Sequence, residues 1–381
     1  MVIEKKGLAI LGSTGSIGRQ TLDVVRSFPN NFRIIGLAGN NNITCLENQI
    51  KEFNPKLISF NSHSRDNHLL SPYEYTNSTM ENMVKDPEVD LVIAATNGCS
   101  SLKPIIEAIN AKKDIGLANK ESIVMAGNLI SQLAHKNNIN IYPLDSEPNA
   151  IWQCIRGEDS GIHKLILTAS GGAVRNHKTT AYANLTPAEV LDHPNWKMGG
   201  KITIDSSTLI NKALEVAESH WLFNIVWEQI DVVMHPESII HSMVEFDDGS
   251  IKAQLSHPDM RLPIQYSLFE QKRQINPKLK RLDLTKINQL NFQKLDKKKY
   301  PCFELAIEIL KLNQTWPAAL CGIDETAVEL FLNNKIKFNQ IYTLIKKTLS
   351  KHQPKDNPDI HQIIDSFNWA KAEGYKLAEE L

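Results

Sequence analysis

Along residues 7–145, short apolar segments alternate with longer amphipathic segments. The short segments have the length and aliphatic composition of buried strands, and the longer ones repeat their apolar positions at helical spacing. Such an alternation predicts a parallel, doubly wound α/β sheet of the Rossmann type, with helices on both faces. The predicted strands are LAILG, RIIGLAG, KLISFN, LVIAA, DIGLAN and INIYPL, and the predicted helices cover 16–27, 43–53, 101–112 and 121–136. The Asn- and Ser-rich segment 61–80 has the least pattern and is predicted to be a loop.

The pattern changes after residue 145 and indicates an α+β region followed by helices. Strand-like segments occur at 162–170, 201–206 and 230–235, and HSMVEFDDGSIKAQL carries Asp248-Gly249 where a hairpin would turn. The basic, polar segment 271–300 is predicted to be a solvated connection. Helical periodicity then predicts a C-terminal bundle, at 303–312, 323–334, 338–350 and 359–379. We therefore expect three regions: a nucleotide-binding domain at 1–145, an α+β domain at 146–290, and a linker with a helical domain at 291–381.

Composition narrows the class of protein. The chain has 381 residues, a formal net charge of −1, 42% hydrophobic and 22% charged residues, which is typical of a globular protein of two or three domains. A balanced charge provides no electrostatic surface for nucleic acid or an anionic membrane, so the expected partner is a small molecule or a protein. The five cysteines lie far apart, the N-terminus lacks a signal-peptide pattern, and no apolar run approaches the roughly 18 residues of a membrane span. We expect a soluble cytoplasmic protein with reduced thiols.

The stretch LAILGSTGSIGRQTLDVV places Gly12, Gly15 and Gly18 between a predicted strand and a predicted helix. Glycines there let backbone amides at the helix N-terminus approach a pyrophosphate, so the turn predicts a nucleotide site; a sheet that only needs a tight turn is the alternative. After the second strand, LAGNNNIT has no acid for the ribose of NAD and no Lys or Arg for the 2′-phosphate of NADP. The missing acid favours NADP, and the asparagines at 40–42 could instead cap the next helix.

Two acids flank a serine in YPLDSEPNAIW, where a strand ends and a helix begins. One explanation is a helix start, with Ser146 as the N-cap, Pro148 in the first turn, and Asp145 and Glu147 favoured by the helix dipole. The other is a site for Mg²⁺ or Mn²⁺, which needs carboxylate oxygens that converge from several elements. A metal site therefore requires a third acid from elsewhere in the chain.

The stretch DSSTLINKALEVAESHW offers such an acid on an amphipathic helix. Its apolar stripe leaves Asn211, Lys212 and Glu215 together on the opposite face. A face of this composition is usually solvated, which is the alternative to a site. Ser206 and Ser207, just before the helix, would make its N-terminal end attractive to an anion.

Three further stretches have the composition of ligand-binding segments. TASGGAVR (168–175) ends a predicted strand in hydroxyls and two glycines, which suits a phosphate, although a plain turn explains it equally well. DHPNWKMGG (192–200) has the composition of a mobile lid whose Trp196 covers a ligand, and packing is the alternative role for its histidine and tryptophan. MHPESIIHSMVEF adds His235 and His241, one or both of which could be structural.

Taken together, these motifs resemble the 1-deoxy-D-xylulose 5-phosphate reductoisomerases, the reducing enzymes of the non-mevalonate isoprenoid pathway. The matching motifs, in family order over most of residues 7–265, are GSTGSIG, LANKES, LDSE, LTASGG, HPNWKMG, DSSTLINKALE, HPESIIHSMVEFDDGS and PDMRLPI. The resemblance implies an N-terminal NADPH-binding domain, a central catalytic domain with a lid and dimer contacts, and a C-terminal helical bundle. It also implies a homodimer that rearranges 1-deoxy-D-xylulose 5-phosphate and reduces it to 2-C-methyl-D-erythritol 4-phosphate, with NADPH and Mg²⁺ or Mn²⁺.

The resemblance also implies roles for individual residues. Asp145, Glu147 and Glu215 match the ligands of the divalent metal, and with Lys120 and His193 they form the implied catalytic group. The implied substrate contacts are Lys120, Ser146, Glu147, Ser170, His193, Trp196, Ser206, Asn211, Lys212 and Glu215. The implied NADPH contacts are Thr14, Gly15, Ser16, Ile17, Gly39, Asn40, Asn41, Asn119, Glu121 and Gly199.

Three positions depart from the family pattern. Pro148 stands where histidine is usual, Asn40 stands where a basic residue commonly meets the 2′-phosphate of NADPH, and LCGIDETAV (320–328) replaces a run rich in asparagine and alanine. Two other functions stay open: a different NAD(P)-dependent dehydrogenase acting on a phosphorylated or carboxylated carbonyl compound, and a catalytically silent nucleotide-binding protein. The acids and the phosphate-binding residues count against the silent protein, which has no need of them.

Overall fold

The computed structural model describes residues 5–60, 73–196 and 198–381 of the chain. They form two compact units. The first unit comprises residues 1–119, 128–149 and 259–280, and the second comprises 120–127, 150–258 and 281–381. The division into three domains at 145 and 290 stays a prediction. Residues 61–72, part of the predicted loop 61–80, and Lys197 in the predicted lid lie outside the described residues.

The first unit is built on a seven-stranded parallel sheet with the strand order β4-β3-β2-β1-β5-β6-β7. The central strands are almost wholly apolar because both of their faces are buried, and Leu8, Ile10 and Leu11 of β1 have no exposed surface. This sheet confirms the doubly wound fold predicted from the alternating pattern. The strands are β1 (Lys6–Leu11), β2 (Phe32–Ala38), β3 (Leu57–Ser59), β4 (Thr76–Asn77), β5 (Leu91–Ala94), β6 (Asp114–Leu117) and β7 (Ile141–Pro143).

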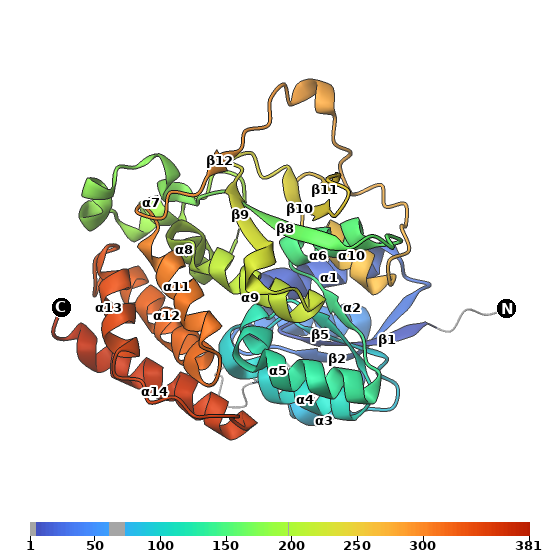
Figure 1. Ribbon diagram of the computed structural model, residues 1–381. Coiled ribbons are helices and arrows are strands. Elements are labelled where there is room, and N and C mark those ends of the chain that lie inside the picture. Colours follow the sequence, from blue (N-terminus) through green and yellow to red (C-terminus); the bar gives the residue numbers. More distant parts are fainter. Residues whose placement is uncertain (1–4, 61–72, 197) are drawn as a thin grey trace. The chain divides into compact units, whose positions relative to one another are not determined.

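Amphipathic helices cover this sheet. α1 buries Leu22, Val24 and Val25 and contacts α10, and α3 and α4 lie together on one side of the strands (Figure 1). The helices are α1 (Ser16–Ser27), α2 (Ile43–Phe53), α3 (Met80–Met83), α4 (Leu102–Asn110) and α10 (Arg261–Leu268). α5 (Lys120–Asn137) begins in the second unit and passes a non-helical Ala126 before it joins the first. Near the end of the predicted loop 61–80, the structure instead has the edge strand β4, and Met80 begins α3.

A topological switch point lies at β1, which pairs with β2 on one side and with β5 on the other. Doubly wound sheets bind ligands beyond the carboxyl ends of their strands at such a point. The glycine-rich turn follows β1 there, and Ala95 and Thr96 follow β5. The fold thus places the predicted nucleotide-binding turn where nucleotides bind in sheets of this class.

The second unit contains a mixed five-stranded sheet with the order β11-β10-β8-β9-β12. β8 pairs parallel with β9 and antiparallel with β10, and the hairpin between β10 and β11 turns at Asp248-Gly249, with Gly249 at φ +82°. This confirms the antiparallel edge and its turn. The strands are β8 (Ile162–Ala169), β9 (Ile230–Met234), β10 (Ile240–Phe246), β11 (Ile251–Leu255) and β12 (Gln293–Lys294).

One face of this sheet packs against helices α6 and α9. Leu165, Leu167 and Val244 from the strands share a buried cluster with Ile151 of α6 and Val216 of α9. The helices of the unit are α6 (Ser146–Ile155, whose first turn is grouped with the first unit), α7 (Pro187–Leu191), α8 (Gly200–Thr208), α9 (Ile210–Phe223), α11 (Pro301–Lys311), α12 (Trp316–Leu332), α13 (Gln340–Leu349) and α14 (Ile360–Ala378). Short 3₁₀ turns lie at Ala173–Asn176, Thr179–Asn184, Trp227–Gln229 and Leu284–Lys286 in this unit and at Gly98–Ser101 in the first.

The strand predicted at 201–206 is wrong, because these residues belong to helix α8. Their alternation of Ile and Thr is typical of a strand, but the carbonyl oxygen of Gly199 accepts from the backbone N–H of Thr203 at 3.2 Å and from its hydroxyl at 2.9 Å. The helix also buries Ile204 fully. The helical hydrogen bonds and the burial of Ile204 thus override the local β propensity of these β-branched residues.

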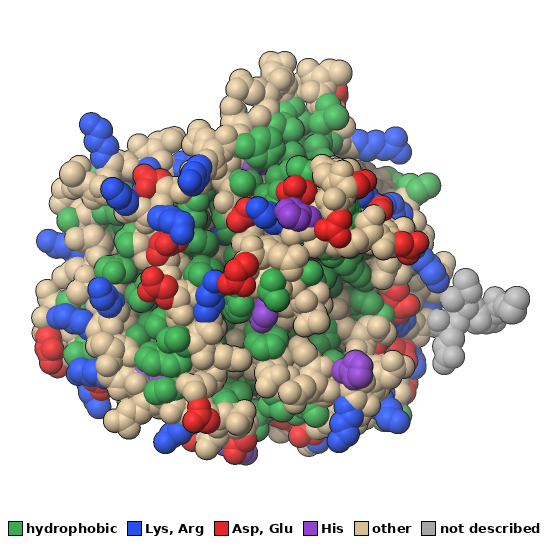
Figure 2. Space-filling view, in the orientation of Figure 1, with side chains coloured by type: hydrophobic (Ala, Val, Ile, Leu, Met, Phe, Trp, Pro, Cys, Tyr) green, Lys and Arg blue, Asp and Glu red, His purple; other side chains and the backbone are tan. Residues whose placement is uncertain are grey.

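Helices α11 to α14, orange to red in Figure 1, form the predicted C-terminal bundle. α12 and α14 approach each other so closely at Gly322 that a Cβ there would lie 2.2 Å from the carbonyl oxygen of Phe367. The unusual run LCGIDETAV therefore packs through its glycine. Among the described residues, no helix has the length and apolar character to cross a bilayer. Basic and acidic side chains are interspersed over the face that Figure 2 draws.

Candidate active site

The glycine-rich turn joins β1 to α1 in the shape that a phosphate requires. Gly12 has φ +86°, and a Cβ there would lie 2.4 Å from the carbonyl oxygen of Ala95. A Cβ at Gly18 would lie 2.3 Å from the carbonyl oxygen of Gly12, so the turn tolerates glycine alone at both positions. α1 begins at Ser16 with no side chain capping its first N–H groups. These N–H groups are the donors that bind phosphate at a helix N-terminus.

The other predicted cofactor residues of the first unit lie on neighbouring loops. A Cβ at Gly39 would lie 3.1 Å from Thr14, and the side-chain amide of Asn119 donates to the carbonyl oxygens of Thr96 and Gly98 at 2.9 Å. Asn42 caps α2 by accepting from the N–H of Cys45 at 3.0 Å, which confirms the capping explanation for this asparagine. Asn40 and Asn41 are exposed. Thr14, Gly15, Ser16 and Ile17 all lie in the glycine-rich turn or the first turn of α1.

The acid turn follows β7 and opens helix α6. α6 begins at Ser146, so Asp145 takes the capping position that the sequence favoured for Ser146, and its carbonyl oxygen accepts from the N–H of Asn149 at 3.0 Å. Asp145 Oδ1 also accepts from the N–H of Ser146 at 3.1 Å, and the Ser146 hydroxyl donates to Glu147 at 2.5 Å. Pro148 lies in the first turn, where a helix needs no N–H. The unusual proline therefore fits this helix start.

The polar face of α9 is buried rather than solvated. Glu215 is 1% exposed and Lys212 4% exposed. Lys120 Nζ lies 3.3 Å from Glu215 Oε1 and 2.7 Å from Asn211 Oδ1, while Lys212 donates to Glu215 Oε2. α9 is joined to α8 through Leu209 alone, a residue with φ +61° that only tight surroundings maintain. Because a buried acid must be paired, the two lysines make this position of Glu215 tenable.

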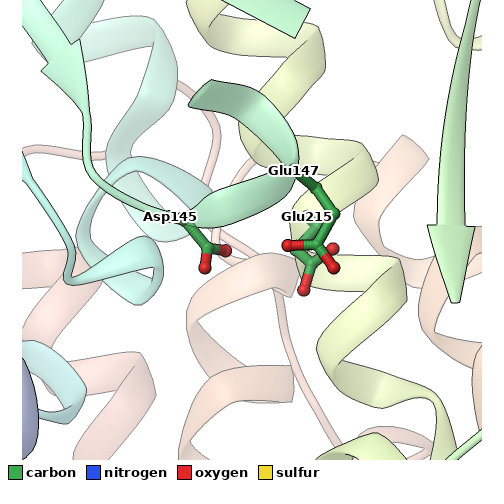
Figure 3. Close-up of side chains that lie close together, drawn as sticks. All are labelled: Asp145, Glu147 and Glu215. Carbon is green, nitrogen blue, oxygen red and sulfur yellow. The ribbon is translucent and has the colours of Figure 1, made fainter. Parts of the chain in front are cut away.

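Three acids from the two motifs come together. α6 is one continuous helix, and its Ile151 shares the buried cluster of Val216, the neighbour of Glu215 on α9. Asp145, Glu147 and Glu215 each offer a carboxylate oxygen, and these oxygens lie within 4.8 Å of one another (Figure 3). Oxygen ligands at this spacing suit a hard divalent cation such as Mg²⁺ or Mn²⁺. The third acid that the sequence required is thus present.

A cluster of hydroxyls with one histidine forms where β8 ends. Ser170 Oγ lies 2.9 Å from His193 Nε2 and 3.5 Å from Ser206 Oγ. Gly172 has φ +65°, and a Cβ there would lie 2.5 Å from the Cα of Ser207, so the turn brings β8 against α8. Hydroxyl and ring N–H groups can donate hydrogen bonds to phosphate oxygens, as backbone N–H groups do at a helix N-terminus. We call Ser170, His193 and Ser206 the hydroxyl cluster.

His193 is neutral, and its proton can be assigned to one nitrogen. Burial, with the nearby Arg175 guanidinium, lowers its pKa to about 4. His193 Nδ1 accepts from the backbone N–H groups of Asn195 at 3.2 Å and Trp196 at 3.0 Å, so the proton of the neutral ring is on Nε2. His193 therefore donates to Ser170 Oγ, and the Ser170 hydroxyl hydrogen is directed elsewhere.

The predicted lid residues are held by local contacts. Trp196 lies edge-on to His241, with ring centroids 6.0 Å apart, and Gly199 precedes α8 as its N-cap. His241 is hydrogen-bonded to Ser256 at 2.9 Å, which supports a structural role for it. His235 accepts from the N–H groups of Ile239 and Ile240 at 3.2 Å, which indicates the same for His235. The proposed roles of Trp196 and Gly199 in ligand binding stay predictions.

Glu121 belongs to a buried cluster that was not identified from the sequence. Lys201 Nζ lies 2.5 Å from Asp205, 2.7 Å from Asp324 and 3.9 Å from Glu121. Asp324 had been noted only as a departure from the family pattern. Neither this cluster nor Arg175 was assigned a role, although the basic residue that ends TASGGAVR was visible. A cation close behind a predicted phosphate turn is the signal that would have drawn attention to Arg175.

Comparisons with known proteins agree along the whole chain. The family model described as 1-deoxy-D-xylulose 5-phosphate reductoisomerase matches residues 8–127. Two models for C-terminal domains of the same enzyme match residues 141–223 and 255–373. The 1-deoxy-D-xylulose 5-phosphate reductoisomerase of Thermoanaerobacter pseudethanolicus is 46% identical over 366 residues, which cover 94% of this chain and 96% of the relative.

Solved structures of such enzymes match with the same coverage. The enzyme from Zymomonas mobilis in complex with NADPH has a TM-score of 0.91 at 34% identity and covers 99% of this chain and 100% of its own. A DOX-P reductoisomerase in complex with NADPH, fosmidomycin and magnesium has a TM-score of 0.90 at 37% identity, with 98% of each chain covered. Full-length identity, shared fold and a convergent acid cluster lead to one conclusion: the chain belongs to the 1-deoxy-D-xylulose 5-phosphate reductoisomerase family.

Proposed function

We propose that Asp145, Glu147 and Glu215 bind the divalent cation with which this enzyme converts 1-deoxy-D-xylulose 5-phosphate into 2-C-methyl-D-erythritol 4-phosphate, using NADPH. The observation that carries the proposal is the convergence of their carboxylate oxygens within 4.8 Å. When bound, Mg²⁺ or Mn²⁺ would act as a Lewis acid toward adjacent ketone and hydroxyl oxygens of the substrate. Three carboxylates leave coordination positions for those oxygens, because such cations take about six or more ligands.

The substrate phosphate would bind at the hydroxyl cluster, with Asn211 and Lys212 of α9. Ser170 supports this role, because His193 donates to its oxygen and leaves its hydroxyl hydrogen to face a phosphate oxygen. Binding the remote phosphate orients the reacting carbons over the acids. Lys120, already 3.3 Å from Glu215, would stabilise negative charge that develops on a substrate oxygen. Ser146 would contact the substrate, and Trp196 would exclude water.

The glycine-rich turn would hold the pyrophosphate of NADPH, which supplies the hydride. The uncapped start of α1 and the close packing at Gly12 and Gly18 support this assignment. Gly39, Asn40 and Asn41 would contact the adenosine part. Asn119, Glu121 and Gly199 would complete the cofactor contacts, as the family motifs imply.

Metal dependence and cofactor preference test the function together. With Mg²⁺ or Mn²⁺, the purified enzyme is expected to oxidise NADPH only when 1-deoxy-D-xylulose 5-phosphate is added, and chelation should abolish the reaction. NADH should be slower, because it lacks the 2′-phosphate that would accept hydrogen bonds from donors at residues 39–42. Absorbance at the nicotinamide band provides the measurement. Turnover that persists in the chelator would exclude the acids as a metal site, and folded protein without turnover would exclude the function.

We also propose that the enzyme is a homodimer. β11 is an outer strand of the second unit's sheet, and its Ile251 is 54% exposed. Leu284 and Phe292, in the connection to β12, are 61% and 48% exposed. β11 and β12 are the two outer strands, so these side chains belong to opposite edges of the sheet. Exposed large hydrophobic side chains near sheet edges are typical of association surfaces.

Light scattering of the eluting protein should show twice the mass of one chain. The double variant Ile251→Asp/Leu284→Asp is expected to elute as a monomer, because charge at the surface opposes its burial. The control Val226→Asp, at a position 53% exposed elsewhere in the unit, should remain dimeric. A monomeric wild-type protein at micromolar concentration would contradict the proposal.

We place the enzyme in the cytoplasm. Cys302 and Cys321 are buried and form no disulfide. Burial raises the pKa of the Cys302 and Cys321 thiols, so these two stay protonated packing groups. Unpaired thiols of this kind are typical of a reducing compartment. Cell fractionation with an antibody to the protein tests the placement, and recovery from a secreted fraction would contradict it.

A further inference from the structure

One backbone carbonyl behind the hydroxyl cluster joins two segments that are far apart in the sequence. The Pro236 carbonyl oxygen accepts from Arg175 Nη1 at 3.1 Å and from Asn195 Nδ2 at 2.5 Å. Arg175 Nη1 also lies 3.4 Å from the carbonyl oxygen of Ser170, the residue whose hydroxyl contacts His193. Arg175 is thus linked both to Ser170 and, through Pro236, to the segment that carries His193.

Asn195 extends this linkage to the imidazole. Its backbone N–H donates to His193 Nδ1 at 3.2 Å, and its side chain also donates to Ser238 Oγ at 3.1 Å. With the N–H of Trp196, two N–H groups therefore point at Nδ1, and a proton on Nδ1 would face both of them. This arrangement allows His193 only one role toward Ser170, that of an Nε2–H donor.

The charge of Arg175 is not cancelled locally. Within the described part of the chain, its hydrogen bonds go to backbone carbonyl oxygens and it has no carboxylate partner. The groups beside it are Lys299, which donates to its carbonyl oxygen, and Tyr300, whose hydroxyl donates to the carbonyl oxygen of Gly171 at 3.1 Å. Neither is an anion. The acid that acts on both of them is Asp296, and within the described residues no ion pair joins it to Arg175.

We infer that Arg175 is a positioning residue for the substrate phosphate: it ties Ser170 to the His193 segment through the Pro236 carbonyl and keeps His193 as a neutral donor. The inference rests on the proposed substrate roles of Ser170 and His193. The Ser170 oxygen already accepts a hydrogen bond from His193, so the Ser170 hydroxyl hydrogen is available to a phosphate oxygen. Arg175 adds attraction for the dianion from behind without touching it.

The test compares Arg175→Met and Arg175→Lys with Lys164→Met as control. Lys164 lies on β8, the strand that leads toward the 3₁₀ turn of Arg175, and its charge is paired with Asp231 at 2.8 Å, so its loss removes equal charge away from the cluster. Two readouts are used: KM and kcat with 1-deoxy-D-xylulose 5-phosphate, and the titration of His193 followed by imidazole ¹⁵N NMR in the free enzyme. His193→Gln assigns the His193 signals.

Arg175→Met should raise KM about tenfold, lower kcat less than about threefold, and leave the NADPH dissociation constant unchanged. It should also raise the pKa of His193 part of the way from about 4 toward its usual value. Burial, the larger cause of the low pKa, remains, but removing a nearby cation favours the protonated ring. Arg175→Lys keeps the charge and should keep the titration of His193. Lys164→Met should match the wild type in both readouts.

Two outcomes would overturn the inference. A raised KM with an unchanged His193 titration would make Arg175 a direct phosphate contact, and unchanged values of both would leave it a structural residue only. If Arg175→Met does not fold, Arg175→Gln retains an amide donor toward Pro236 without the charge and is measured in the same way. If His193→Gln has the wild-type KM, the proposed substrate role of His193 is wrong. The titration of His193 is measured in the free enzyme, so it tests the positioning role of Arg175 separately.

Discussion

Replacing Glu215 with glutamine should lower kcat by about a thousandfold or more while NADPH binds with nearly unchanged affinity. The substitution keeps the shape of the side chain but removes one of three carboxylates whose oxygens lie within 4.8 Å. Metal-based stabilisation of transition-state charge is worth several kcal/mol, and about 1.4 kcal/mol corresponds to a tenfold change in rate. NADPH is expected to bind mainly at the glycine-rich turn, which Glu215 does not contact. The measurements are steady-state kinetics, Mn²⁺ titration calorimetry and NADPH fluorescence.

The Mn²⁺ titration separates a lost ligand from a damaged fold. Weaker Mn²⁺ binding together with normal NADPH binding is the expected pair of results. Glu228→Gln is the control, because Glu228 is an exposed acid of the same unit that pairs only with Lys311 at 3.0 Å in the described structure. Normal turnover in Glu215→Gln, or unchanged Mn²⁺ affinity, would remove Glu215 from the metal site.

The second large effect is expected at Lys201, where methionine should lower the free energy of unfolding by about 3–5 kcal/mol. Lys201 donates to Asp205 and Asp324, which are 3% and 1% exposed. In the described structure, one oxygen of each of these carboxylates already has no hydrogen-bond partner. Removal of the ammonium leaves two buried carboxyl groups facing each other with no cation, which is far more costly than the loss of a surface ion pair.

This loss of stability should increase with pH. Burial and the neighbouring Asp324 raise the pKa of Asp205, so the folded state retains a proton that the unfolded chain has released above about pH 4. A folded state that binds more protons loses stability as pH rises, and without Lys201 no cation offsets the loss. The destabilisation in Lys201→Met should therefore be larger at pH 8.5 than at pH 5.

Tryptophan fluorescence during urea unfolding can measure this effect in the second unit, which contains Lys201, Asp205 and Asp324. All six tryptophans lie in the second unit, at positions 152, 196, 221, 227, 316 and 369. Lys201→Met/Asp324→Asn should recover part of the stability by removing one anion, and the control Lys311→Met should change it by less than about 1 kcal/mol. Equal stability of Lys201→Met and the control would show that the cluster contributes nothing to folding.

The parts of the fold that the sequence predicted correctly are those whose pattern is local. Strands such as β1 and β5 are short apolar runs, and α1 and α2 repeat at helical spacing, so both periods could be read directly. The segment 201–206 failed because its β-branched residues have a strand's pattern in a helix held by tertiary contacts. α12 begins at Trp316, seven residues before the predicted start. Gly322 interrupts the apolar period, but it lies inside the helix and packs against Phe367 of α14.

The site was harder to predict than the fold because burial does not follow from polarity. Asn211, Lys212 and Glu215 have the composition of a solvated face, yet Lys212 and Glu215 are buried. Hydrogen bonds among the three residues and with Lys120 make this burial possible. The convergence of Asp145 with Glu215 spans about seventy residues and was proposed from family motifs rather than from spacing. The roles of Arg175 and Lys201 depend in part on Pro236 and Asp324, which are distant in sequence, so the local pattern does not reveal them.

The lysines around Glu215 also bear on how the protein depends on metal supply in the cell. Because Lys120 and Lys212 neutralise this acid, the chain can bury it before any cation arrives. We therefore expect this region to fold without a metal supply. A cation that bound Glu215 would have to displace the lysines, which would then be available to the anionic groups of the substrate.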